Sequence, residues 1–151
     1  MSYQFDEKLT SALERCGWHP KRKVKTSHYA SDWKKDGYQI FRQALEFAES
    51  FGGITLLHPA YSGGASDESC FDPSAATRRL DRAWVVEDYE RLAKEMLVPV
   101  GQGYSGHLTY LIGNRGGFYG GFDDYFCKIG ASVEEAMVRI IFNKEFNKLS
   151  D

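Results

Sequence analysis

The spacing of apolar residues along the chain predicts three amphipathic helices. In residues 5–16 the apolar positions recur every three or four residues, and a glycine follows the stripe. Residues 36–51 repeat this pattern with Asp36 as the N-cap, and two glycines end the helix. The apolar face of this second helix is wide, which predicts that it is buried against a sheet. Residues 132–141 open with Ser132-Val-Glu-Glu, a capping box, before another apolar stripe.

Strand and turn patterns lie between these helices. Residues 54–58 predict a first strand, and residues 107–112 alternate between two faces in β-favouring residue types. Residues 59–83 are rich in loop formers, whereas the apolar residues of 86–96 recur at helical spacing. Nine of the 15 glycines fall in residues 101–130, which predicts turns between antiparallel strands. This order of elements predicts an α+β fold whose sheet is largely antiparallel or mixed and packs against several helices.

The composition supports one folded domain over residues 1–151. A chain with 42% hydrophobic and 15% aromatic residues can bury a core of its own, in which we expect Trp18, Phe47, Phe51 and Ile140. The net charge of −2 produces no overall attraction to nucleic acid or to an anionic membrane. The charged N-terminal start and the lack of a long apolar run lead us to expect a cytoplasmic protein with no membrane partner.

A basic run at residues 21–25 is the one feature that suggests nucleic acid. Four of its five residues are basic, but residues 1–50 as a whole hold nine basic and seven acidic side chains. No aromatic residue interrupts the run to stack on bases. Lysines on an exposed extended segment also discourage edge-to-edge pairing of strands, which explains them without a ligand. We therefore expect no nucleic-acid partner.

The cysteines and histidines do not form a metal or disulfide pattern. Cys16, Cys70 and Cys127 are odd in number and far apart, so we expect reduced, packed thiols. The four histidines include no pair at the i, i+4 spacing of helical zinc ligands, and each is expected to be a surface or structural residue. The sequence therefore predicts no metal and no cofactor.

Residues 101–106 read Gly-Gln-Gly-Tyr-Ser-Gly, which matches the G-x-G-x-x-G fingerprint of dinucleotide-binding turns. That fingerprint requires a helix to open at its last glycine, because the helix N-terminus holds the pyrophosphate. Only six residues separate Gly106 from the turn formers at 113–117, and they alternate as a strand does. We therefore interpret the glycines as part of a hairpin and expect no bound dinucleotide.

Two further arrangements resemble catalytic sites without meeting their requirements. Ser105 stands in a sequence close to a nucleophile elbow, but no helix follows it and a histidine replaces the final glycine. Asp123 and Asp124 are adjacent, and neighbours in a strand point to opposite faces, so a turn is the better interpretation. No nucleophile, base and charge stabiliser converge, and an enzyme is not expected.

Several short motifs occur in a fixed order over residues 16–143. They are Cys16-Gly17-Trp18, Lys21-Arg22-Lys23, Phe51-Gly52-Gly53, Phe71-Asp72-Pro73, Pro99-Val100-Gly101, Gly117-Phe118-Tyr119-Gly120 with Asp123, and Ile129-Gly130-Ala131-Ser132-Val133-Glu134-Glu135-Ala136. Each motif alone is modest, but their order and spacing resemble the SUKH superfamily, its third subgroup in particular.

The resemblance implies an α+β fold and a bacterial immunity protein that binds and neutralises a cognate polymorphic toxin, often a nuclease or another toxic enzyme. It carries over no catalytic residue, and the motifs that carry it mark the fold rather than the binding surface. The alternative is a non-catalytic regulatory module that binds a cellular partner. The oligomeric state is not indicated by the sequence.

Acidic and aromatic residues in the loops form our hypothesis for the partner-binding surface. Residues 51–100 hold eight acidic and five basic side chains, and the acids before Asp81 lie in the loop-rich stretch. Acids speed the encounter with a basic partner, and buried aromatic side chains slow its dissociation. The predicted partner-binding residues are Tyr61, Asp67, Glu68, Asp72, Tyr104, Tyr119, Asp123 and Asp124.

Overall fold

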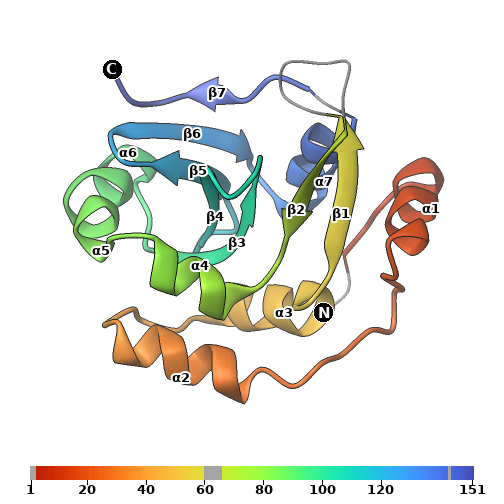
Figure 1. The fold of residues 1–151 in the computed structure, drawn as a ribbon, viewed down its shortest axis with the longest axis horizontal. Coiled ribbons are helices and arrows are strands. Elements are labelled where there is room, and N and C mark those ends of the chain that lie inside the picture. Colours follow the sequence, from red (N-terminus) through yellow and green to blue (C-terminus); the bar gives the residue numbers. More distant parts are fainter. Residues whose placement is uncertain (1–2, 60–65, 143) are drawn as a thin grey trace.

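The computed structural model describes residues 3–59, 66–142 and 144–151, in which a seven-stranded antiparallel sheet is surrounded by helices (Figure 1). The strands follow one another across the sheet in chain order. They are β1 Thr55–Pro59, β2 Ser66–Cys70, β3 Leu97–Gly103, β4 Leu108–Gly113, β5 Phe118–Phe122, β6 Tyr125–Gly130 and β7 Asn147–Lys148. The predicted α+β fold with an antiparallel sheet is confirmed.

Helices lie before, within and after this series of strands. They are α1 Glu7–Arg15, α2 Ser27–Lys35, α3 Arg42–Phe51, α4 Pro73–Arg79, α5 Arg82–Trp84, α6 Glu90–Ala93 and α7 Val133–Ile141, and a π-helical segment, η1 Val85–Tyr89, joins α5 to α6. Ser132 caps α7 as predicted, because its hydroxyl accepts a hydrogen bond from the backbone N–H of Glu135.

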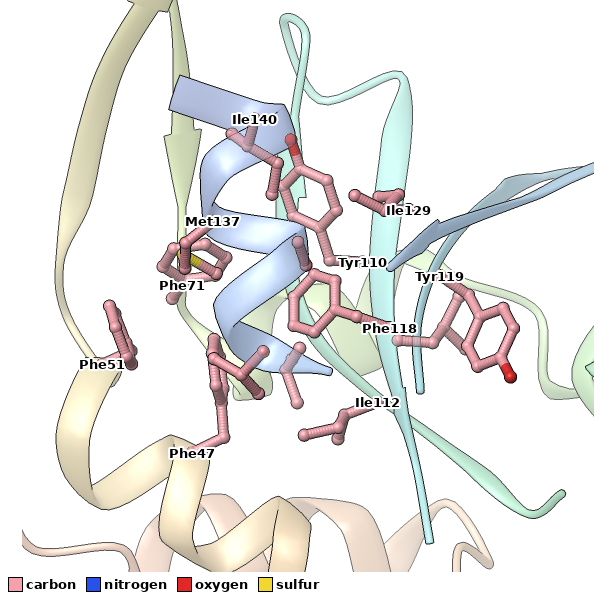
Figure 2. Close-up of a cluster of buried hydrophobic side chains, with 14 of the residues drawn as sticks. Phe47, Phe51, Phe71, Tyr110, Ile112, Phe118, Tyr119, Ile129, Met137 and Ile140 are labelled. Carbon is pink, nitrogen blue, oxygen red and sulfur yellow. The ribbon is translucent and has the colours of Figure 1, made fainter. Parts of the chain in front are cut away.

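Side chains cover both faces of the sheet. The ring of Phe118 contacts Phe47 of α3, with 5.4 Å between the ring centroids, whereas the next residue, Tyr119, stacks on Phe126. Phe126 in turn stacks on Tyr89 of η1. Because successive residues of a strand point to opposite faces, α3 and η1 lie on opposite sides of the sheet. Figure 2 shows the ring of Tyr119 pointing away from Phe118, and β4 is buried along its whole length.

A group of aromatic rings fills the space between α3 and the sheet (Figure 2). Phe47 and Phe51 stack with 4.9 Å between their centroids, and Phe71 meets both rings edge-on. Such offset and edge-on contacts are the favoured geometries for aromatic pairs. Trp18 is 5% exposed, and Phe47, Phe51 and Ile140 are fully buried. The predicted burial of these four residues is confirmed.

The helix predicted over residues 36–51 begins only at Arg42, and the assignment of Asp36 as its N-cap is wrong. Asp36 instead ends α2, and Gly37 follows with φ of +91°, a conformation in which the chain turns away from the helix. Three apolar residues after Gly37, namely Tyr38, Ile40 and Phe41, pack on the core from outside any helix, and Tyr38 is 6% exposed. The spacing of these residues matches that of one more helical turn, and for this reason the sequence pattern predicted a helix that begins too early.

The stretch at 59–83, predicted to be rich in loops, contains a strand and a helix. β2 has the polar sequence Ser-Asp-Glu-Ser-Cys, in which only Ser69 is buried. The sequence therefore contains no alternation of apolar residues that would predict this strand. Pairing with β1 over five residues holds it in the sheet. α4 begins after Asp72, whose side chain accepts a hydrogen bond from Ala75 N–H, with Pro73 at the first helical position.

Replacing Phe51 by alanine tests the placement of the core. Because the ring is fully buried among five other aromatic rings, we expect Phe51→Ala to lower the free energy of unfolding by about 3–5 kcal/mol. Leu57→Ala is the control, since Leu57 is 65% exposed and its loss is expected to cost less than about 0.5 kcal/mol. Urea denaturation followed by circular dichroism measures both, and an unchanged midpoint for Phe51→Ala would contradict the described core.

Candidate partner-binding surface

The glycines of the G-x-G-x-x-G sequence lie in a hairpin. Gly101 and Gly103 belong to β3, and Gly106 lies in the turn that leads directly into β4. A Cβ atom on Gly101 would lie 2.7 Å from the carbonyl oxygen of Cys70, so this glycine allows close packing of the backbone. A strand, β4, rather than a helix follows Gly106, so the helix that the fingerprint requires after its last glycine is missing, and the interpretation of this segment as a hairpin is confirmed.

Two turns at the same end of the sheet enclose an apolar groove of about 320 Å³. One turn connects β3 to β4, the other connects β5 to β6, and the residue before β7 closes the third side. The lining side chains are Tyr104, His107, Leu108, Phe122, Tyr125 and Phe146. Phe122 is 45% exposed although its ring stacks on Tyr125 at a centroid distance of 4.9 Å. The groove is therefore a place where apolar surface reaches solvent.

The turn between β5 and β6 is tight, and a side chain of η1 anchors it. Phe122 pairs with Tyr125 in the sheet, which leaves Asp123 and Asp124 as the two turn residues. Asp123 has φ of +46°, a conformation that aspartate tolerates better than most residues. The hydroxyl of Tyr89 donates a hydrogen bond of 2.6 Å to the Asp123 carbonyl oxygen. The predicted turn is confirmed, and the hydrogen bond anchors the backbone that carries two exposed aspartates.

The structure brings five of the eight predicted residues to this end of the sheet. Tyr104 lines the groove, and its backbone N–H donates to the carbonyl oxygen of Glu68 at 3.3 Å. Asp67 lies next to Glu68 and accepts a hydrogen bond from its backbone N–H. Asp123 and Asp124 follow Phe122 on the opposite wall. Residues from three separate segments of the sequence therefore lie at one end of the sheet, and of the five Tyr104 lines the groove.

Three predicted residues do not join this group. Asp72 lies beyond the other end of β2, where its carboxylate caps α4. Tyr119 is 2% exposed and donates its hydroxyl hydrogen to Glu95, and burial is the main reason that its pKa is raised. Its ring is therefore not available to a partner. Tyr61 lies outside the described residues.

Five lining residues were not identified from the sequence: His107, Leu108, Phe122, Tyr125 and Phe146. Phe122 and Tyr125 flank the Asp123-Asp124 turn, so an aromatic residue on each side of a two-residue turn was the available signal. No local pattern indicates that Phe146, from the far C-terminal segment, lies 6.2 Å from the ring of Tyr104. That contact depends on the path of the chain after α7.

The family comparison agrees with this architecture. The model of the SUKH-3 immunity protein family matches residues 5–143, nearly the whole chain. The chain belongs to the SUKH-3 immunity protein family. The resemblance noted in the sequence is thereby confirmed, whereas the chain has no significant match among curated proteins or among solved structures.

A buried polar network lies below the groove of this SUKH-3 protein. The Tyr110 hydroxyl is 2.6 Å from Ser69 Oγ, which is 2.7 Å from His58 Nε2, and His58 Nδ1 is 2.9 Å from the Pro59 carbonyl oxygen. Since a carbonyl only accepts, Nδ1 carries the hydrogen and Nε2 accepts from Ser69. Ser69 is fully buried, so the pair cannot act on a substrate as a serine nucleophile and its base. The predicted structural role of His58 is confirmed.

The remaining groups of interest in this SUKH-3 protein are its possible metal ligands and its thiols. In the described ranges no three metal-binding side chains converge, and no helix there is long and apolar enough to cross a membrane. The three cysteines are free, as predicted, but the expectation that all are packed is wrong for Cys70, which is exposed. Burial raises the pKa of the Cys127 thiol to about 11.

Nucleotide titration tests the hairpin interpretation of this SUKH-3 protein. Because β4 follows the glycines directly, we expect isothermal titration with NAD and with ATP to show no binding. Affinity in the micromolar range or tighter for either nucleotide would contradict the interpretation.

Thiol labelling tests the burial of Cys127. At pH 8 only about 0.1% of a thiol with a pKa near 11 is ionised, so a disulfide reagent is expected to modify Cys70 rapidly and to leave Cys127 unmodified. In denaturant all three cysteines are expected to react. Mass spectrometry of the labelled peptides measures each site, and rapid native labelling of Cys127 would show that the sheet opens there.

Proposed function

We propose that this protein binds a cognate toxin and neutralises it in the bacterial cytoplasm. The observation that carries the proposal is the match of the SUKH-3 immunity protein family to nearly the whole chain. The apolar groove and the carboxylates at the same end of the sheet support it, because they supply the two features that a protein-binding surface needs. These are apolar side chains that lose contact with water on binding and charges that orient the partner.

The proposed surface consists of Asp67, Glu68, Tyr104, Asp123 and Asp124. Nuclease active sites contain basic residues that bind phosphates, so a nuclease toxin is the partner that these acids suit best. Long-range attraction between an acidic surface and a basic cleft raises the association rate and weakens as salt screens it. Generally, immunity proteins are not enzymes, and the proposed mechanism is stoichiometric blockage of the toxin.

Removal of the carboxylates tests the proposed surface. The partner is the toxin domain encoded by the gene beside that of the protein, and surface plasmon resonance measures binding at two salt concentrations. We expect Asp67→Asn/Glu68→Gln and Asp123→Asn/Asp124→Asn each to lower the association rate roughly 3- to 30-fold at low salt and to reduce its salt dependence. Asparagine keeps the turn, because it also tolerates positive φ.

The matched control is Glu7→Gln/Glu14→Gln, which removes two exposed carboxylates from α1. It is expected to leave the rate and the salt dependence unchanged. Equal effects of all three double variants would place the interface elsewhere. If the wild-type protein neither binds the toxin nor protects cells that express it, the immunity proposal fails and the regulatory alternative becomes the better one.

A further inference from the structure

A second hollow adjoins the apolar groove and differs from it in chemistry. It has a volume of about 250 Å³ and lies between the end of α4, the start of α5 and the same two turns. Its lining includes Arg79, Asp81, Trp84, His107, Phe122 and Asp123. His107 and Phe122 also line the groove, so these two side chains separate an apolar hollow from a polar one.

We propose that the two hollows form one socket for a toxin segment that carries an apolar side chain beside a lysine or arginine. The apolar side chain enters the groove against Phe122, and the basic side chain enters the polar hollow between Asp81 and Asp123. This inference rests on the proposed function, since it specifies which chemistry of the toxin the surface recognises.

The apolar half of the socket follows from the exposure of Phe122. A phenylalanine that is 45% exposed beside an apolar groove leaves surface in water that a partner side chain can cover. The ring is held by its stacking on Tyr125 and by the pairing of these two residues across the hairpin. Little side-chain entropy is therefore lost when a partner packs on it, which is typical of anchor positions in interfaces.

The half of the socket that would bind a basic side chain follows from two carboxylates, those of Asp81 and Asp123. Asp81 Oδ1 accepts a hydrogen bond from Ala83 N–H, which leaves its second oxygen for another donor. Asp123 is exposed, and no lysine or arginine of the described residues forms an ion pair with Asp81, Asp123 or Asp124. Arg79 also lines this hollow, and it lies in the last turn of α4, where the helix carbonyls favour a cation. Two carboxylates against one guanidinium leave the hollow with a net negative charge, which favours a basic side chain.

The two halves are expected to give different kinetic signatures, and surface plasmon resonance with the neighbouring-gene toxin domain distinguishes them. Phe122→Ala is expected to raise the Kd about 10- to 100-fold through faster dissociation, while the salt dependence of the association rate stays unchanged. Asp123→Asn is expected to slow association about 3- to 10-fold at low salt and to lose this effect at high salt.

Met96→Ala is the control for Phe122→Ala, because Met96 is 37% exposed and lies before β3, at the end opposite to the groove. It is expected to bind like the wild type. Circular dichroism confirms that each variant folds, and Phe122→Thr, which keeps a residue favourable to strands, replaces the alanine variant if that one unfolds. If the wild type binds and the Kd of the Phe122 variant equals that of the wild type, the socket is overturned while the immunity proposal stays intact. No binding by the wild type would contradict the proposed function itself.

Discussion

The consecutive antiparallel pairing of the strands is the constraint on which the rest of this structure depends. When each strand pairs with the next one along the chain, every second turn falls at the same end of the sheet. The turn between β3 and β4 and the turn between β5 and β6 are therefore neighbours, although about 20 residues separate Tyr104 from Asp124. The groove exists because these two turns lie side by side. Its walls are held in place because each turn connects two paired strands of the sheet.

Burial of both sheet faces makes that rigidity possible. Gly121 has room for no side chain, because a Cβ there would lie 2.6 Å from the ring of Tyr89. The same tyrosine stacks on Phe126 and donates a hydrogen bond to the Asp123 carbonyl oxygen. One residue of η1 thus connects the core to the turn that carries the proposed recognition site, and burial raises its pKa so that the phenol stays protonated as a donor.

The acidic residues divide into those that serve the fold and those that face solvent. Asp72 caps α4, and Glu95 accepts hydrogen bonds from Tyr119 and from the backbone of the turn between β4 and β5. In the described structure the carboxylates of Asp123 and Asp124 cap no helix and form no ion pair, and these residues lie on a turn that the Tyr89 hydroxyl anchors, beside the exposed ring of Phe122. A count of acids along the sequence treats these groups alike, whereas their hydrogen bonds separate them.

The sequence by itself determined the α+β class, the helices α1 and α7, the hairpin at Gly101–Gly106 and the core positions of Phe47 and Phe51. These features depend on local periodicity, capping and turn chemistry, which act over a few residues. The order of short motifs in the sequence also indicated the family. The tertiary structure alone decided the start of α3, the strand β2 and the groove. β2 is polar and is held by pairing with its neighbours, and Phe146 reaches Tyr104 only because the chain returns along β6, so both depend on contacts between distant segments that no local pattern encodes.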